Sequence, residues 1–265
     1  MKQSSICVLI PYYEADNQLL LSLNSLEGDI LVDTVIVDDG SLLYPASKVL
    51  KNYEYESSHV HLIQINKNSG IENALNVGLK YCIPRYEFIA RLDAGDFCKN
   101  MRIQKQYSYM INNPEIAMLG TWADFTDYSG NFLFTRKMPQ QKKIAMKMKF
   151  NNVFVHPSVM FRSEALKTVG LYSTSYPAAE DYEMFFRMVN AYDCHNLQET
   201  LLDYVVDTNS ISSKKRLKQI VSKLRIQYKY NDRSLTAYLG MLRTVITLAI
   251  PRGFTTYFRG LLRTS

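Results

Sequence analysis

Residues 35–41 read Val-Ile-Val-Asp-Asp-Gly-Ser, a short apolar run that ends abruptly in acidic and small polar residues. Three consecutive β-branched residues indicate a strand that is buried on both faces. The Asp-Asp-Gly that follows is typical of the turn that ends such a strand. Strands of this kind occur in parallel sheets that helices cover on both sides. The stretch therefore predicts an α/β fold with polar side chains just beyond the carboxyl end of a strand.

The same pattern recurs on both sides of this stretch. Further apolar runs with the length of strands lie at residues 6–10, 60–65, 88–90 and 116–120. Between the runs, apolar residues recur at helical spacing over 17–26, 46–56, 71–80 and 101–112. Alternating strands and helices predict a Rossmann-like, mostly parallel central sheet with helices on both faces.

Polar residues follow each of the first four predicted strands, at 11–14, 38–41, 66–70 and 91–96. The carboxyl ends of neighbouring parallel strands meet at one edge of a sheet, where ligands bind in such folds. We therefore expect these four segments, which are far apart in the sequence, to form a single crevice.

Several classes of protein are excluded by motifs that the sequence lacks. No Gly-x-Gly-x-x-Gly follows the first strand and no Gly-x-x-x-x-Gly-Lys-Ser/Thr is present, which removes the main support for a dinucleotide fold or a P-loop. The four cysteines are widely spaced without a Cys-x-x-Cys pair, so we expect neither a disulfide framework nor a zinc site. No signal peptide is recognisable at the N-terminus. A cytoplasmic protein is therefore expected.

Asp93 and Asp96 follow a predicted buried strand, where carboxylates are costly unless something compensates their charge. A magnesium or manganese ion that bridges a diphosphate would compensate it, since these cations prefer carboxylate and phosphate oxygens. The alternative is that the acids cap a helix that begins near Asn100.

A second acidic segment, Ala-Glu-Asp-Tyr-Glu at 179–183, precedes an apolar helical run. Acids commonly occupy the first turn of a helix because they complement its dipole. A carboxylate at this place is also suited to act as a general base for a sugar hydroxyl, and the spacing alone leaves both readings open. His156 likewise suits either a structural role or a functional one, as a metal ligand or as a hydrogen-bond donor to the phosphates.

The charge is distributed unevenly along the chain. Residues 214–265 contain twelve Lys or Arg and one acidic residue, for a net charge of +11, whereas residues 1–213 carry 19 basic and 24 acidic residues, for −5. Basic residues mixed with aromatic and aliphatic ones favour an interfacial helix on an anionic membrane. A packed helical appendage with solvated charges is the alternative. The acidic front half and the lack of an RNA-binding motif argue against a nucleic-acid partner.

Seven blocks together resemble the family 2 glycosyltransferases of the GT-A fold. Four lie in the first half, at 8–13, 35–41, 68–78 and 90–96, and three in the second, at 156–162, 169–172 and 179–183. The second set is similar to the acceptor half of bacterial polysaccharide glycosyltransferases. The resemblance spans roughly residues 5–205 and implies a glycosyltransferase domain over 1–213, with a nucleotide-sugar half (1–120) and an acceptor half (121–213). A basic amphipathic helical tail follows over 214–265.

The resemblance also implies roles for individual residues. The nucleotide-sugar, usually a UDP-sugar, would be bordered by Pro11, Tyr13, Glu14, Asp39, Asn68, Ser69, Gly70, Arg91 and Asp93. Asp39 would bind the uracil, and Asp93 would face the ribose or the metal. Asp181 corresponds to the catalytic base of an inverting transfer, with Glu180 beside it at the acceptor.

The sequence departs from the family pattern at one position. The family often has Asp-x-Asp-Asp in the fourth block, and the third position, which binds the metal, is Gly95 here. We expect the metal, Mn²⁺ or Mg²⁺, to be bound by Asp96 together with Asp93 and His156.

The expected activity is transfer of a hexose or N-acetylhexosamine from a UDP-sugar to an undecaprenyl-diphosphate-linked sugar. It would serve O-antigen or capsule assembly at the inner face of the cytoplasmic membrane. Two alternatives remain open. A nucleotidyltransferase should have a Gly-rich phosphate loop after the first strand, where this sequence has Pro11-Tyr12-Tyr13-Glu14. A non-catalytic subunit that binds a nucleotide-sugar is the second alternative, because Gly95 stands where the family often has its metal-binding aspartate.

Overall fold

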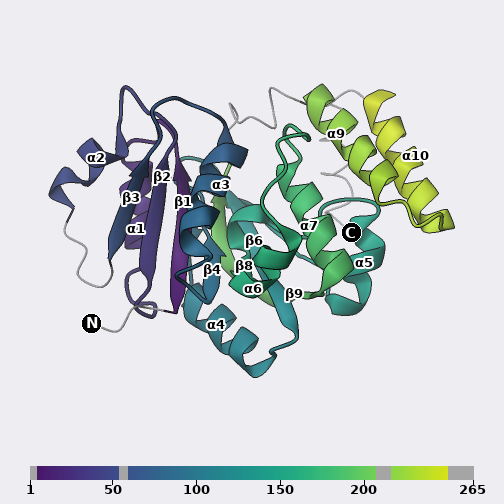
Figure 1. Ribbon diagram of the computed structural model, residues 1–265, viewed down its shortest axis with the longest axis horizontal. Helices are drawn as coiled ribbons and strands as arrows, with labels where there is room; N and C mark the ends of the chain where they lie inside the picture. The colour runs from purple at the N-terminus through teal and green to yellow at the C-terminus, as the bar shows by residue number, and fades with distance from the viewer. Residues whose placement is uncertain (1–4, 54–58, 207–215, 250–265) are drawn as a thin grey trace.

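A computed structural model describes residues 5–53, 59–206 and 216–249. Within these residues the strands are β1 (Ile6–Tyr12), β2 (Asp33–Asp38), β3 (Val60–Gln64), β4 (Phe88–Arg91), β5 (Phe97–Cys98), β6 (Ile116–Thr126), β7 (Phe132–Arg136), β8 (Met160–Arg162) and β9 (Asp193–Val205). They form one sheet in the order β3-β2-β1-β4-β8-β6-β9-β5, with β7 paired to β6 (Figure 1).

The first half of the sheet is parallel, as the sequence predicts. Strand β1 pairs in parallel with β2 and β4, and β2 pairs in parallel with β3. The second half is mixed. Strand β8 runs antiparallel to β4 and β6, whereas β6 and β9 form a long parallel pair. The predicted strand at 116–120 is only the first half of β6, which continues to Thr126 and pairs there with β7.

Helices cover both faces of the sheet, which confirms the predicted α/β architecture. They are α1 (Gln18–Asn24), α2 (Ala46–Val49), α3 (Ile71–Cys82), α4 (Arg102–Asn112), α5 (Gln141–Met148), α6 (Ser163–Val169), α7 (Glu180–Ala191), α9 (Arg216–Lys229) and α10 (Leu235–Ala249). Short 3₁₀ turns lie at Leu50–Asn52 and His156–Ser158. The helix predicted over 46–56 is wrong in length: α2 ends at Val49, a 3₁₀ turn follows over Leu50–Asn52, and residues 54–56 lie outside the described residues. Ala46 is the only buried residue of α2, and Val49, Leu50 and Tyr53 pack against the core only in part.

Alternation along β1 divides the core into two layers. Cys7 and Leu9 pack on one side of the sheet, in a cluster that includes α3 and α7. Val8 and Ile10 pack on the other side, with α1 and α4. Because successive side chains of a strand point to opposite faces, one apolar strand anchors both helical layers and fixes where its carboxyl end lies.

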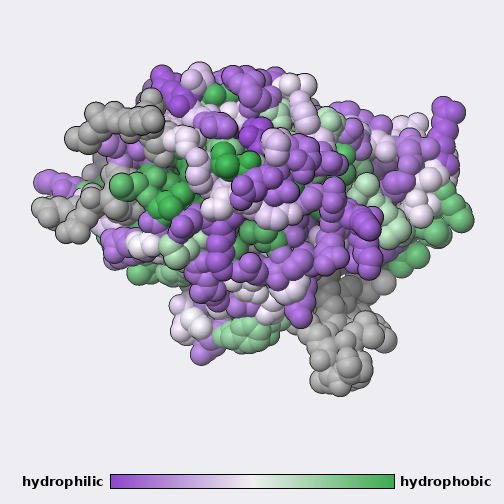
Figure 2. Space-filling model, turned by 90° about the horizontal axis from the view of Figure 1, so that it is seen from below, coloured by the Kyte–Doolittle hydropathy of each residue, from purple (hydrophilic) through white to green (hydrophobic). Residues whose placement is uncertain are grey.

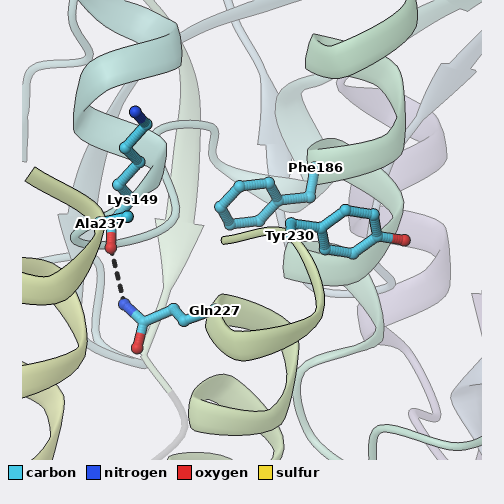
Figure 3. A pocket seen from close by; sticks show the side chains of 5 residues that line it. All are labelled: Lys149, Phe186, Gln227, Tyr230 and Ala237. Carbon is cyan, nitrogen blue, oxygen red and sulfur yellow. Dashed lines mark hydrogen bonds between the residues drawn. The ribbon is translucent and has the colours of Figure 1, made fainter. Parts of the chain in front are cut away.

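The C-terminal helices α9 and α10 lie side by side at the end of the molecule farthest from β3 (Figure 1). Figure 3 shows how α9 is attached to the domain: Tyr230 stacks on Phe186 of α7, with ring centroids 5.3 Å apart, and Gln227 Nε2 donates to the carbonyl of Lys149 at 2.7 Å. The buried carboxylate of Glu183 on α7 accepts from the Tyr230 hydroxyl at 2.7 Å. The expected helical appendage therefore packs directly on the helix that begins with Glu180 and Asp181.

Helix α10 turns its larger apolar side chains outward. Its buried positions are small, at Ala237, Gly240 and Thr244. Its exposed positions, at helical spacing, are Leu235, Tyr238, Leu239, Leu242, Val245, Ile246 and Leu248. Figure 2 shows hydrophobic side chains gathered at this end of the molecule. Of the helices in the described ranges, none has the length and apolarity needed to span a bilayer. The tail residues predicted at 214–215 and 250–265, and the boundary at 213, lie outside the described residues.

Candidate active site

The loops after β2 and β3 are joined by Asp39. Its buried carboxylate accepts hydrogen bonds from the Ser69 amide and hydroxyl and from the Gly70 amide, all between 2.8 and 3.1 Å. Gly40 permits this close approach, because a Cβ there would lie 2.7 Å from the Asn68 nitrogen and its φ of +75° is unfavourable for other residues. The structure thus brings Asp39, Asn68 and Gly70 together, as the four-segment crevice requires. Asp39 as a uracil ligand stays a prediction.

Glu14 joins the loop after β1 to the loop after β2. Its carboxylate accepts from the backbone amides of Leu42, Leu43 and Tyr44, at 2.6, 3.1 and 2.8 Å. Burial would raise the pKa of this carboxyl, but the three amide donors outweigh it and hold the pKa below its usual value. Glu14 therefore keeps a negative charge and fixes the loop beside Tyr13, whose side chain is 52% exposed. Pro11, in contrast, is buried within β1.

The loop after β4 contains a buried ion pair. Arg91 is 2% exposed, and its Nη1 donates to Asp93 at 2.6 Å. Its Nε and Nη2 are buried and have no hydrogen-bond partner among residues 5–53, 59–206 and 216–249. Burial acts to lower the pKa of Arg91, but the negative charge of Asp93 and that of Asp96 keep it above its usual value. This guanidinium is charged and presents two unpaired donors, which suits it to a bound anion.

Asp96 is the most deeply buried acid of this loop. Its Oδ1 accepts from the Val205 amide at 2.9 Å, and its Oδ2 is buried and has no partner in the described part of the chain. Burial, and then the nearby charge of Asp93, raise the pKa of Asp96 well above its usual value. The capping alternative fails here, since Asp29 rather than Asp93 or Asp96 accepts from the first amides of α4, those of Ile103 and Gln104.

Gly95 has a conformation that disfavours the family's usual aspartate. Its φ is +104°, and a Cβ at this position would lie 3.0 Å from the side-chain oxygen of Gln18. Its amide donates to the Ser22 hydroxyl at 2.8 Å. The loop is therefore built around glycine, and its acidic groups are Asp93 and Asp96.

The second acidic segment lies at the start of α7. Asp181 accepts from Asn152 Nδ2 at 2.7 Å, and Glu180 Oε2 is buried and has no partner in the part of the chain that the structure describes. Burial and the adjacent charge of Asp181 raise the pKa of Glu180 to about 8. Burial also raises the pKa of Asp181, and the charge of Arg91 opposes both shifts. Arg91 is thus electrostatically coupled to the acids of both segments.

His156 is paired with a tyrosine rather than with the acids. Its Nε2 lies 2.9 Å from the hydroxyl of Tyr172, which is 4% exposed. Burial, and then the charge of Arg91, lower the pKa of His156 well below its usual value. The imidazole is therefore neutral and beside the guanidinium.

Comparison with known proteins agrees with this arrangement. The model of the family described as "Glycosyl transferase family 2" matches residues 7–170, which include the loops after β1 to β4 and His156. The chain belongs to glycosyltransferase family 2. Membership favours the predicted glycosyltransferase over the nucleotidyltransferase and non-catalytic alternatives.

Relatives of this family 2 glycosyltransferase span most of the chain. The O-antigen biosynthesis glycosyltransferase WbnJ of Escherichia coli is 28% identical over 212 residues, covering 77% of this chain and 81% of WbnJ. Among solved structures, TarS 1–349 of S. aureus in complex with UDP has a TM-score of 0.64 and 18% identity, covering 91% of this chain and 70% of that one. The chain covers 41% of a longer TarS structure. The mannosyltransferase PcManGT of Pyrobaculum calidifontis, in complex with GDP-Man and Mn²⁺, has a TM-score of 0.65 and 12% identity. The match covers 100% of this chain and 82% of PcManGT.

Glycosyltransferases of this type typically use a divalent metal, as the Mn²⁺ in PcManGT illustrates. In the described residues, no three His, Cys, Asp or Glu side chains are grouped so as to hold a metal by themselves. The residues fit a metal that is shared with a diphosphate, because such ions take only one or two carboxylates from the protein. Asp96, whose Oδ2 is buried and has no partner among the described residues, and the nearby Asp93 are the residues that would supply those ligands.

Three residues of this site were not predicted as site residues from the sequence: Asn152, Tyr172 and Arg136, whose charge acts on Asp181. Tyr172 lies in one of the matched blocks, and its position there is the signal that could have drawn attention to it. For Asn152 and Arg136 the sequence gives no signal, because their proximity to Asp181 depends on the packing of β7 and of the loop before His156.

Proposed function

We propose that this glycosyltransferase transfers a hexose or N-acetylhexosamine from a UDP-sugar, with inversion, to a sugar linked to undecaprenyl diphosphate. The observation that carries the proposal is a set of buried, unpaired polar atoms around one crevice: Arg91 Nε and Nη2, Asp96 Oδ2 and Glu180 Oε2. Buried polar groups normally have partners, so unpaired ones of both signs indicate a polar ligand that binds there. The likeness to WbnJ supports a surface-polysaccharide role, such as O-antigen or capsule assembly.

The donor half of the proposal rests on the loops after β1, β2, β3 and β4. Pro11, Tyr13 and Glu14 border the nucleobase, and Asp39 with Asn68 and Gly70 forms the neighbouring wall. The TarS structure with UDP supports a uridine nucleotide. The Arg91 donors would bind the nucleotide's phosphates, and Asp93 and Asp96 would hold Mn²⁺ or Mg²⁺. Such a metal would supply positive charge to balance that of the diphosphate leaving group.

The acceptor half of the proposal assigns the base to Asp181. Its carboxylate removes the proton from the acceptor hydroxyl, whose oxygen attacks the anomeric carbon on the face opposite to UDP. The new carbon–oxygen bond forms as the bond to UDP breaks, and UDP leaves with the bonding electrons. Glu180, whose pKa of about 8 keeps it largely protonated at neutral pH, is able to donate a hydrogen bond to the acceptor. His156 stays near the phosphates as a neutral group.

We further propose that the enzyme associates peripherally with the inner face of the cytoplasmic membrane through α9 and α10. A water-soluble helix normally buries its larger apolar side chains, whereas α10 exposes them and buries Ala237, Gly240 and Thr244. On α9 the exposed residues combine Leu217, Val221 and Tyr228 with Lys218, Arg225 and Lys229. An apolar face flanked by cations suits an anionic bilayer, which also holds a lipid-linked acceptor.

The proposed activity is tested by a donor screen. The chain is incubated with labelled UDP-glucose, UDP-galactose and their N-acetylhexosamine counterparts, a synthetic polyprenyl-diphosphate-linked sugar and Mn²⁺. We expect release of UDP and a labelled product that partitions into organic solvent with one of the donors. Calorimetry in parallel should show that Mn²⁺ tightens binding of UDP. No lipid-extractable product with any donor would contradict the acceptor assignment, and no binding of UDP would contradict the donor assignment.

A further inference from the structure

Three aromatic rings form a row across neighbouring strands. Phe125 of β6 stacks on Phe134 of β7 with ring centroids 4.6 Å apart and planes 11° apart. On its other face Phe125 stacks on Tyr204 of β9, at 4.5 Å and 25°. The three residues are direct partners in the strand pairing, so their side chains lie on one face of the sheet.

The row of rings continues into the acidic loop. Strand β5 pairs antiparallel with β9, and Cys98 lies opposite Leu202. Two residues along each segment from this pair, Asp96 and Tyr204 therefore lie on the same face of the sheet. The Val205 amide, next to Tyr204, donates to Asp96 at 2.9 Å. Tyr204 therefore forms the inner end of the row, between the Phe125 ring and Asp96.

Charged groups from both sides of the crevice surround Tyr204. Burial, and then the negative charges of Asp96, Asp93 and Asp181, raise the pKa of its hydroxyl, while Arg136 opposes the shift. Arg136 lies two residues after Phe134 on β7 and also acts on Asp181. The strand register and the Val205–Asp96 hydrogen bond place Tyr204 beside the acidic loop after β4, and Asp181 is near enough to act on it electrostatically.

A pyranose ring has an apolar C–H face and polar edges, so an aromatic ring flanked by carboxylates and a guanidinium suits it well. A ring that is already held by stacking, as Tyr204 is by Phe125, loses little conformational entropy when it binds. We propose that Tyr204 is a sugar-contacting residue, whose ring packs against a pyranose of the donor or of the acceptor at the point of transfer, with Phe125 stacked on it and holding it in place. This inference rests on the proposed function, since it places Tyr204 between the donor and acceptor sites.

The test compares Tyr204→Leu with Tyr204→Phe, which retains the ring. Phe134→Leu is the matched control, because it also removes a ring from the row but at the end away from Asp96. Calorimetry measures the affinity for UDP and for the four common UDP-hexoses, and kinetics measure KM for the donor and for the polyprenyl-diphosphate-linked acceptor. Thermal unfolding of each variant reports the loss of stacking itself.

We expect Tyr204→Leu to leave UDP affinity unchanged and to weaken one sugar contact roughly three- to tenfold, as loss of one aromatic contact predicts. A weaker affinity for UDP-hexose relative to UDP identifies the donor sugar, and a raised KM for the acceptor identifies the acceptor sugar. Tyr204→Phe should behave like the parent in both assays.

The inference is overturned if Tyr204→Leu leaves both sugar contacts unchanged in an active enzyme. It is also overturned if Phe134→Leu weakens the sugar contacts as much as Tyr204→Leu does. The three rings would then affect sugar binding only by stabilising the fold. Failure of the proposed function has a different signature, since the parent chain itself would then bind no UDP or transfer no sugar.

Discussion

The guanidinium of Arg91 lies 2.6 Å from the carboxylate of Asp93 at the carboxyl end of β4, and two of its nitrogens have no partner among the described residues. Its positive charge acts on the acids of both segments and on His156. Its removal would leave Asp96 compensated only by Arg102, and Asp181 by Arg136, among the charges that act on them in the described part of the chain.

Arg91→Met should therefore lower both stability and nucleotide affinity. Removing one partner of a buried ion pair costs about 3–5 kcal/mol, and we expect roughly 2–3 kcal/mol here because Asp93 is 31% exposed. Urea unfolding and UDP calorimetry measure the two effects. Arg85→Met, at an exposed arginine, is the control. The double variant Arg91→Met/Asp93→Asn should recover part of the stability, and an Arg91→Met variant as stable as the parent would refute this role.

Asp181→Asn should abolish transfer while UDP affinity stays within about twofold. A general base contributes about 10²–10⁴-fold to the rate, and the amide cannot accept the proton. UDP release measures turnover, and calorimetry measures binding. Asp127→Asn provides a control, since Asp127 also accepts local backbone amides but lies in the β6–β7 turn. Normal turnover by Asp181→Asn would show that another group, with Glu180 the nearest candidate, acts as the base.

The raised pKa of Glu180 predicts how stability depends on pH. In the folded state burial and Asp181 raise this pKa to about 8, and Glu72 adds to the shift while Arg91 opposes it. The folded chain therefore holds the proton over a range where the unfolded chain has lost it. Its contribution to stability is present below the unfolded pKa, declines as the pH rises, and is fully lost above about 8.

Glu180→Gln isolates this effect, because glutamine cannot ionise. The variant and the parent should have similar unfolding free energies at pH 4, and the variant should be more stable by a few kcal/mol at pH 9. Urea unfolding at pH 4, 6.5 and 9 provides the comparison. A difference that does not change with pH would mean that Glu180 ionises normally in the folded protein.

The sequence located the polar residues after β1 to β4 well, because they directly follow apolar strands, and their roles in binding the donor stay predictions. Asp39, Asn68, Gly70, Arg91 and Asp96 each lie within a few residues of a strand end, so a local pattern locates them. The common edge of the four parallel strands then brings them together.

The acceptor side was much harder to predict from the sequence. Tyr204 meets Phe125 only because β6 and β9 pair across about eighty residues, with register shifts that no local pattern records. Asn152 meets Asp181 through a loop without regular structure. The role of Glu14 was missed for another reason: its carboxylate binds backbone amides of residues 42–44, which present no characteristic side chains.

The outward apolar face of α10 predicts which substitutions should release the enzyme from membranes. Leu242 and Ile246 are 55% and 49% exposed and lie one turn apart on this face. Burying a Leu or Ile side chain contributes about 1.5–3 kcal/mol, so replacing both by serine should weaken binding to phosphatidylglycerol vesicles at least tenfold. Leu21→Ser/Leu31→Ser, at exposed leucines of the donor half, is the matched control and should bind normally.

Raising the salt concentration should weaken the parent's binding as well, since the basic residues of α9 act electrostatically. Equal vesicle binding by the two double variants would refute α10 as the membrane-binding face, and binding that is equally strong to neutral phosphatidylcholine would refute the contribution of the basic residues.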